Sequence, residues 1–441
     1  MNRSDRTSLA RDLAATFLAG PWERREMARR AAASFGLPRS PRWLSTLARE
    51  VVRVFGPDPP HGRDGRIAAL IAPRLRPLRR AGIARRPALV HPCLVPARMG
   101  TAAAPVLRER GLPEVATPGE LAAWLGLDRD RLAWLADVRG LSRRTHDGPL
   151  VHYRYRWVPK RSGGARLLEI PKPDLAAAQR KILRELLDRV PPHASAVGFR
   201  KGRNVLDHAS AHAGAAVVLR MDLGDFFASV AATRVHAIFV ALGYPAAVSS
   251  LLTGLCTHRT SMFVRHASTD HAAWSRLRER HLPQGAPTSP ALANLAAFGL
   301  DVRLAALASK AGAAYTRYAD DLAFSGGTGF ARSAAAFHVL ACAIVIEESF
   351  APNPRKTRIM RASSRQQITG LVVNAKPSLP RDELDRLKAT LHNCVAHGPA
   401  SQNRDGRADF RAWLAGKVAW VASVHPARGA RLRAMLERIR W

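Results

Sequence analysis

Two adjacent aspartates, Asp320 and Asp321, occur in the run A-A-Y-T-R-Y-A-D-D-L-A-F-S-G, between two short apolar, β-prone runs. A third aspartate, Asp222, closes the apolar run A-A-V-V-L-R-M-D. Adjacent carboxylates repel each other unless they share a proton or bind a cation. Three convergent carboxylates can hold two Mg²⁺ ions about 4 Å apart for in-line phosphoryl transfer, and hard oxygen ligands favour Mg²⁺ over zinc. Y-A-D-D alone is more often a surface turn, so the combination with Asp222 carries the hypothesis of a two-metal site.

The elements that must position these acids are a buried strand that ends at Asp222 and a β-hairpin with Y-A-D-D at its tip. From about Tyr153 onward, β-like runs alternate with helices, which we predict at Leu175–Val190 and Leu292–Ser309. The alternation lacks the cadence of a parallel βαβ fold, so it predicts the α+β class. After Lys376 the pattern is helical again.

The first 150 residues differ from the rest in composition and in the spacing of their apolar residues. Residues 1–55 alternate arginine with apolar residues at helical spacing, which predicts amphipathic helices. Residues 56–113 are rich in proline and arginine and predict a basic connector, with one helix near Arg66–Arg80. Residues 114–150 predict a helical hairpin, whose first helix begins at Thr117 in a capping pattern. Such a hairpin is more often a packing element than a helix-turn-helix DNA reader.

The charge is the outlying property of the composition. Lysine and arginine number 69 against 34 acidic residues, giving a formal charge of +35 and a pI near 11.6. Drift in a GC-rich genome would explain arginine in place of lysine, but not twice as many bases as acids. The excess therefore indicates a polyanionic partner, either nucleic acid or an anionic membrane surface.

Several features argue for a cytoplasmic protein without a membrane partner. The four cysteines are far apart and form no C-x-x-C pair, which argues against disulfides and cysteine-type zinc sites. No apolar run is expected to reach the roughly 20 residues that span a bilayer. The N-terminus lacks the apolar stretch of a signal peptide.

The motifs taken together resemble the reverse transcriptase family. Seven blocks follow the family's order between about Tyr153 and Lys376: R-W-V-P-K-R-S-G-G-A-R-L-L-E-I-P-K-P, V-G-F-R-K-G-R-N-V-L-D-H, M-D-L-G-D-F-F, L-P-Q-G-A-P-T-S-P, Y-A-D-D, P-N-P-R-K-T-R-I-M and Q-Q-I-T-G-L-V-V-N. Within the family, N-V-L-D-H and I-T-G resemble the N-A-x-x-H and V-T-G elements of the bacterial retron type. The departures from those elements are conservative. The chain is longer than many retron enzymes, which lack a segment like residues 1–150.

The resemblance implies a right-hand polymerase fold of fingers, palm and thumb, behind a mostly helical and basic N-terminal extension. The implied domains are the extension with its connector at 1–113, the helical hairpin at 114–150, fingers and palm at 151–376, and a helical thumb at 377–441. The implied activity is RNA-directed DNA polymerisation from dNTPs with two Mg²⁺ ions. A retron enzyme would use a cognate structured non-coding RNA as template and primer. It would make a short single-stranded DNA branched from that RNA, in antiphage defence with an effector protein.

The resemblance also implies roles for individual residues in catalysis and in nucleotide binding. Asp222, Asp320 and Asp321 would be the catalytic, metal-binding carboxylates. Lys356 would protonate the leaving pyrophosphate, although a phosphate contact or simple exposure is nearly as good an interpretation. Phe227 would exclude a ribose 2′-hydroxyl, the alternative being a core position. The remaining nucleotide-binding positions are Lys160, Arg166, Gln284 and Gly285.

The RNA-binding positions are also implied by resemblance. Asn204 and His208 lie four residues apart and share a helix face, so they would hold the template-primer RNA, the alternative for His208 being a structural histidine. Lys417, Arg428 and Arg431 belong to a basic and aromatic C-terminal pattern suited to a nucleic-acid duplex.

Two alternatives to this assignment stay open at this point. The chain could be another prokaryotic reverse transcriptase, of the group II intron or diversity-generating type. It could also be a catalytically idle RNA-binding defence protein that keeps the fold. Intact Asp222, Asp320 and Asp321 argue against the idle form.

Overall fold

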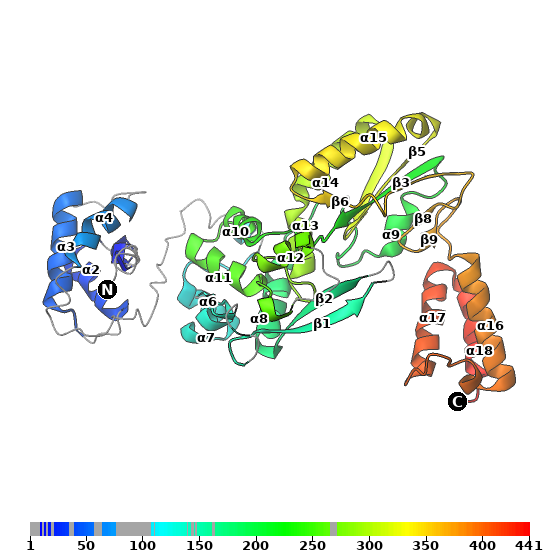
Figure 1. Cartoon of the computed structure of the whole chain (residues 1–441), viewed down its shortest axis with the longest axis horizontal. Helices are drawn as coiled ribbons and strands as arrows, with labels where there is room; N and C mark the ends of the chain where they lie inside the picture. Colours follow the sequence, from blue (N-terminus) through cyan, green and yellow to red (C-terminus); the bar gives the residue numbers. More distant parts are fainter. Residues whose placement is uncertain are drawn as a thin grey trace. The chain divides into compact units, whose positions relative to one another are not determined.

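The computed structural model describes residues 9–10, 13–14, 16–18, 22–34, 39–56, 64–75, 107–109, 111–138, 140–142, 145, 148–160, 164–264 and 271–441 (Figure 1). Most of the predicted connector at 56–113 lies outside these residues. The chain divides into two compact units, one of residues 1–190 with 231–288 and the other of residues 191–230 with 289–441. These units do not follow the four expected domains, which stay a prediction.

The N-terminal helices of the first unit confirm the predicted amphipathic pattern. They are α2 (Arg24–Ser34), α3 (Arg42–Phe55) and α4 (Asp64–Arg74). In α3, one face of Leu44, Leu47, Ala48 and Val51 is buried, as a helical period requires. This face packs with Met27, Ile67 and Ile71 into one apolar core. The remaining part of the helix expected to Arg80 lies outside the described residues.

The predicted helical hairpin is present as α6 (Pro118–Leu125) and α7 (Arg129–Leu135). Thr117 and Glu120 form the expected capping box, in which each side chain bonds the other's backbone amide. Asp128 caps α7 by accepting a hydrogen bond from the Arg131 amide. Both helices pack against α11 (Ala246–Cys256). They are therefore packing elements of the first unit.

The rest of the first unit combines a β-hairpin with helices. Strands β1 (Tyr153–Pro159) and β2 (Ala165–Pro171) pair antiparallel, and residues 161–163 between them lie outside the described part. The helical elements are α8 (Pro173–Glu185), η3 (Leu187–Arg189), α10 (Ala232–Ala241), η4 (Met262–Val264) and α12 (His271–Arg278). The helix expected at Leu175–Val190 thus begins earlier and closes as a short 3-10 turn.

A five-stranded antiparallel sheet forms the centre of the second unit. Its strands are β3 (Val217–Gly224), β4 (Ala313–Tyr318), β5 (Asp321–Gly326), β6 (Ala351–Pro352) and β7 (Arg358–Arg361), in the order β4-β5-β3-β6 with β7 also on β3. Its flanking helices are α9 (Val205–Ser210), α13 (Ser289–Ala296), α14 (Phe298–Lys310) and α15 (Thr328–Glu347). Mixed helices and antiparallel strands agree with the expected α+β class.

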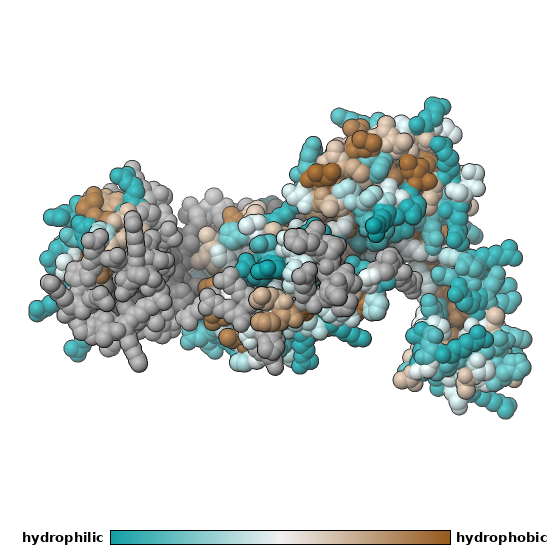
Figure 2. Space-filling model, viewed as in Figure 1, coloured by the Kyte–Doolittle hydropathy of each residue, from teal (hydrophilic) through white to brown (hydrophobic). Residues whose placement is uncertain are grey.

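One expectation about apolar length was wrong. Helix α15 is long and apolar enough, by length and composition, to cross a membrane, and α13 with α14 would pass the same test as one bent span. Yet Phe330, Phe337 and Val345 lie on one buried face of α15, which packs on β3 and β5. The other face leaves apolar side chains exposed, and Figure 2 shows apolar surface over this helix. Core helices give the same signal, so the absence of a membrane partner stays a prediction.

The C-terminal part of the second unit is helical, as expected after Lys376. A short hairpin of β8 (Gln367–Ile368) and β9 (Leu371–Val372) precedes α16 (Arg381–His397), η5 (Pro399–Ser401), α17 (Phe410–Val424) and α18 (Pro426–Glu437). Leu391, Leu414, Val418 and Leu432 are buried where these helices meet. Trp413 and Trp420 pack partly against that core.

Candidate active site

The aspartates come together because β3 and β5 pair in one register. Asp222 and Asp321 are directly opposite each other across the two antiparallel strands. The carbonyl of Asp320, in the turn before β5, accepts a hydrogen bond of 2.9 Å from the Leu223 amide. The predicted hairpin is confirmed. The predicted strand is present but continues past Asp222 to Gly224. The pairing of the strands brings the three carboxylates to the same end of the sheet.

Asp222 is the most enclosed of the three, at 3% exposure. Its Oδ2 accepts a hydrogen bond of 2.7 Å from Lys356 Nζ, and its Oδ1 accepts one of 2.9 Å from Asn353 Nδ2. The backbone amide of Asn353 also donates to the backbone carbonyl of Asp222 at 2.8 Å. Lys356 therefore reaches the carboxylate site, where the sequence hypothesis requires it.

Asp321 is paired with an arginine on the neighbouring strand. Arg220 donates to Asp321 Oδ1 from Nε at 3.1 Å and from Nη2 at 2.8 Å. Burial raises the pKa of Asp321, and Arg220 opposes that rise by favouring the charged carboxylate. Arg220 was not predicted as a site residue, although it stands two residues before Asp222 and so on the same strand face.

The donor chemistry of the site fits a divalent cation. Burial first, and then the charges of Asp222 and Asp321, raise the pKa of Asp320. A cation between these carboxylates would relieve that repulsion, and all the donors are hard oxygens. Among the residues that the structure describes, however, no three acidic, histidine or cysteine side chains already form a metal-binding cluster. Lys356 and Arg220 hold the oxygens of two of the aspartates.

A buried ion pair lies directly behind the aspartate turn. Arg317 and Asp301 are both fully buried and bond through two contacts of 2.8 and 2.6 Å. Arg317 Nη1 also donates to the carbonyl of Ala319 and to Asn294 Oδ1, each at 3.0 Å. Ala319 has φ +57°, so the turn that presents Asp320 is held in a left-handed conformation.

Phe227 lies beside this site in an aromatic group. Its ring centroid is 5.7 Å from that of Phe226, which is buried and packs on Phe350. On another side, the Phe199 ring lies 5.9 Å from the Phe227 ring. Phe227 itself is half-buried, and its predicted role at the sugar of the nucleotide stays a prediction.

In the first unit, Gln284 and Gly285 form the predicted irregular loop and dock on β2. The Gln284 carbonyl accepts a hydrogen bond of 2.8 Å from the Glu169 amide. Gly285 has φ +129°, and a Cβ there would lie 3.1 Å from the Glu169 carbonyl oxygen. The glycine is therefore required both by its conformation and by the close approach of two backbones.

The Glu169 side chain bonds the same loop at a second point. Its carboxylate and His281 are each 1% exposed and 2.9 Å apart, and Thr260 donates to the other oxygen at 2.6 Å. The pair is charged: His281 holds the pKa of Glu169 below its ordinary value, and Glu169 raises that of His281, each against the effect of burial.

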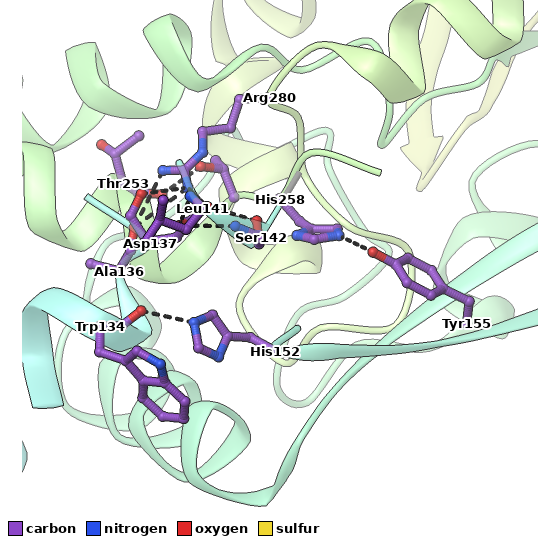
Figure 3. Close-up of polar contacts among 11 residues, drawn as sticks. Trp134, Ala136, Asp137, Leu141, Ser142, His152, Tyr155, Thr253, His258 and Arg280 are labelled. Atoms are coloured by element: carbon purple, nitrogen blue, oxygen red, sulfur yellow. Dashed lines mark hydrogen bonds and ion pairs between the residues drawn. The ribbon is translucent and has the colours of Figure 1, made fainter. Parts of the chain in front are cut away.

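Arg280, next to His281 in the sequence, and His258, whose backbone bonds that of His281, make further polar contacts (Figure 3). Arg280 Nη2 lies 3.4 Å from Asp137 Oδ2, and the same carboxylate oxygen accepts a hydrogen bond of 2.7 Å from the Ser142 hydroxyl. Tyr155 and His258 are bonded at 2.7 Å, as Figure 3 also shows. The segment before Gln284 is thus held by further, partly buried polar contacts.

Lys160 and Arg166 lie at the end of the β1–β2 hairpin, as predicted. Both are exposed, and Arg166 is opposite Val158 in the strand register. The Lys160 amide donates to the Gly164 carbonyl at 2.9 Å. Their part in triphosphate binding stays a prediction.

The structure gives Asn204 and His208 different environments. Asn204 is exposed and caps α9, its side chain accepting from the Leu206 and Asp207 amides. His208 is fully buried, and its Nδ1 lies 2.6 Å from the Thr316 hydroxyl. Burial lowers the pKa of His208 to about 3, so the ring is neutral. In this conformation the His208 ring packs inside the second unit and is not exposed to solvent. Helical spacing alone does not show which face of a helix is buried, so the predicted RNA contact of His208 has no support from its position.

The predicted C-terminal RNA-binding residues are exposed on α17 and α18: Lys417, Arg428 and Arg431. Lys417 Nζ lies 5.9 Å from the centre of the Trp413 ring. The ammonium is thus within cation–π distance of the ring. An RNA contact by these residues stays a prediction.

Three residues of the site were missed from sequence: Arg220, Asn353 and Arg317. Asn353 stands in P-N-P-R-K-T, the block from which only Lys356 was chosen. Arg317 stands in Y-T-R-Y-A-D-D, two residues after the buried Tyr315, so both side chains lie on the same buried face of β4. A basic residue on the buried face of a strand is the signal that could have been used, because such a charge requires a partner.

Comparison with known proteins identifies the family of the chain. Residues 158–373 match the family model described as reverse transcriptase (RNA-dependent DNA polymerase). The chain is 38% identical over 344 residues to the retron Mx162 reverse transcriptase of Myxococcus xanthus, covering 75% of this chain and 68% of that one. It is 40% identical over 329 residues to the retron Mx65 reverse transcriptase of the same organism, covering 74% and 72%. Identity to the retron Ec86 reverse transcriptase of Escherichia coli is 33% over 244 residues, covering 55% and 69%. The chain therefore belongs to the bacterial retron-type reverse transcriptases and is an RNA-directed DNA polymerase.

Proposed function

We propose that this reverse transcriptase copies part of a cognate structured non-coding RNA into a short single-stranded DNA that stays branched from that RNA. The observation that carries the catalytic part is the pairing of β3 with β5, which sets Asp222 opposite Asp321 with Asp320 in the adjoining turn. The retron type of the relatives supports the choice of template and product. In this proposal residues 151–376 form the fingers and palm, residues 377–441 form the helical thumb, and residues 1–150 form the N-terminal extension and the helical hairpin.

The proposed cofactor is a pair of Mg²⁺ ions bound by Asp222, Asp320 and Asp321. When bound, the ions would lower the pKa of the attacking hydroxyl and stabilise the leaving pyrophosphate. Lys356 lies at Asp222 and would donate a proton to the pyrophosphate from its ammonium. Phe227 would stand under the sugar and leave no room for a 2′-hydroxyl.

Nucleotide and RNA binding are assigned to the remaining predicted residues. Lys160 and Arg166 would bind the triphosphate, whose oxygens accept charge-assisted hydrogen bonds. Gln284 and Gly285 would lie against the incoming dNTP. Asn204, with Lys417, Arg428 and Arg431, would contact the RNA or its DNA hybrid. This partner is a polyanion, which agrees with the formal charge of +35.

The test of catalysis is extension of a primer on an RNA template with dNTPs and Mg²⁺. We expect a DNA product with the parent chain and about a hundredfold less, or none, with Asp320→Asn. DNA synthesis that does not depend on Asp320 would show that the proposed site is not the polymerase site. Omitting Mg²⁺, or replacing it with Ca²⁺, separates a metal requirement from a simple ionic-strength effect.

The retron product requires a second test. The chain is co-expressed with the RNA encoded beside it, and the isolated DNA is digested with ribonuclease. A branched product should lose mass on digestion and keep a short RNA remnant on its 5′ end. An unlinked DNA would contradict the branched product but leave RNA-directed synthesis standing.

The proposed biological role is antiphage defence with an effector protein. It is tested by plaque counts on cells that carry the complete locus with the parent chain or with Asp320→Asn. Protection that depends on Asp320 would support the role. Equal protection by both would show that defence does not require DNA synthesis by this chain.

A further inference from the structure

Phe199 has a backbone conformation that aromatic residues rarely adopt. Its φ is +60°, in the left-handed region, where the Cβ of a bulky residue meets the backbone. Its side chain is also 43% exposed, so burial of the ring does not explain the strain. Strained residues persist only where their surroundings fix them, and they concentrate at functional sites.

The surroundings of Phe199 fix it against the aspartate turn. The Val197 amide donates to the Arg317 carbonyl at 2.8 Å, which adds this segment beside β4. A Cβ on Gly198 would lie 2.7 Å from the Ala319 nitrogen, so only glycine allows this approach. Asn294 Nδ2 donates to the Gly198 carbonyl at 2.9 Å, and Asn294 is itself bonded by Arg317. The loop before Phe199 and the turn before Asp320 therefore form one rigid assembly.

This assembly directs the Phe199 ring to Phe227. The two ring centroids are 5.9 Å apart at an interplanar angle of 43°, and Phe199 also lies 6.4 Å from Tyr318. Phe227 has buried Phe226 on one flank. Phe199 covers another flank of the Phe227 ring, which is half-buried. Without the Phe199 ring, that flank would be more open to solvent.

We propose that Phe199 is a specificity-determining residue that holds the Phe227 ring in the position that excludes a ribose 2′-hydroxyl. The inference rests on the proposed role of Phe227 as the sugar gate. A steric gate rejects one extra oxygen only if the ring cannot turn aside. Phe199 needs no contact with the nucleotide, because it acts through Phe227 and is a positioning residue.

The experiment measures the ratio of kcat/KM for a dNTP to that for the matching ribonucleotide on an RNA template. Phe227→Ala should lower this ratio the most. Phe199→Ala should lower it about threefold to tenfold, the range expected from one aromatic pair. The double variant should have the same ratio as Phe227→Ala alone, because Phe199 can act only through the Phe227 ring. Phe298→Ala is the matched control, since Phe298 is 45% exposed and its ring partner is His193.

The outcomes distinguish the positioning role of Phe199 (the brace) from the steric role of Phe227 (the sugar gate). An unchanged ratio in Phe227→Ala would overturn the sugar gate and the brace together. A lower ratio in Phe227→Ala with the parent ratio in Phe199→Ala would overturn only the brace. Additive losses in the double variant would also overturn it, because Phe199 would then act independently. Phe199→Tyr keeps the ring and should keep the parent ratio, and Phe199→Leu gives a second test of ring loss if the alanine variant fails to fold.

Discussion

Lys356 and Asp222 form an ion pair of 2.7 Å at the edge of the sheet where the three aspartates meet. Asp222 is 3% exposed, whereas the Lys356 side chain is 43% exposed. The buried carboxylate is therefore held by a cation that solvent can reach. The ammonium and a bound metal ion would compete for the same oxygen.

Lys356→Met should show this competition. The variant keeps an apolar stem but removes the positive charge that pairs with the Asp222 carboxylate. The free energy of unfolding without Mg²⁺ should therefore fall by about 1 kcal/mol, a small value because the Lys356 side chain is exposed to solvent. The added stability on titrating Mg²⁺ should be larger than in the parent, and polymerisation should slow. Thermal unfolding with and without Mg²⁺ measures the first two. Lys310→Met, an exposed lysine of α14, is the control. Equal Mg²⁺ stabilisation in variant and parent would contradict the competition.

Asp320→Asn should separate activity from stability. The pKa of Asp320 is raised by burial and by its acidic neighbours, so its ionised form is unfavourable to the fold at neutral pH. Removing the charge should leave the free energy of unfolding in metal-free buffer unchanged or higher. DNA synthesis should fall by about a hundredfold or more, as expected when a metal ligand is lost. Urea unfolding and primer extension on the same preparation check both. A variant that is inactive because it is less stable would contradict this account.

Arg317→Met should destabilise the second unit strongly. It leaves Asp301 as an unpaired charge with no exposure, which typically costs about 3–5 kcal/mol. It also removes the donor to the Ala319 carbonyl in the turn before Asp320. Arg303→Met is the control, since Arg303 pairs with Glu347 and Glu348 at the surface and should change unfolding by less than about 1 kcal/mol. Similar urea midpoints for the two variants would show that burial of the pair does not matter.

The local elements of the site were predictable, but its contacts were not. The Y-A-D-D hairpin follows from two β-prone runs around a short turn, and both strands are present. The pairing of Asp222 with Asp321 joins strands about a hundred residues apart, and no local pattern sets that register. The single helix expected at Leu292–Ser309 is broken at Ala297, and the prediction of one helix did not use Gly299, two residues later, as a sign of that break. Helical spacing put Asn204 and His208 on one face, yet only tertiary packing buries His208.

The buried pair of Glu169 and His281 should make the first unit sensitive to pH. The raised pKa of His281 means that its contribution is complete below about pH 6.5, its ordinary pKa, and is lost as the pH rises through its folded pKa. The lowered pKa of Glu169 means that its contribution is present above about pH 4.5 and is lost as the pH falls. His258 beside them has its pKa lowered to about 4 by burial and stays neutral in this window. The pair should therefore stabilise the fold most between about pH 4.5 and 6.5.

Glu169→Gln tests this pH dependence and the support of the Gln284 loop together. The amide keeps the shape and the Thr260 contact but loses the charge, so the stability lost relative to the parent should be larger at pH 5.5 than at pH 8.5. At neutral pH the variant should raise KM for the dNTP more than it lowers kcat, because the loop is loosened while the aspartates are untouched. His236→Gln, in the same unit and bonded to Ser250, should show neither effect. A stability loss that does not change with pH would show that the charge of the pair is not what holds the loop.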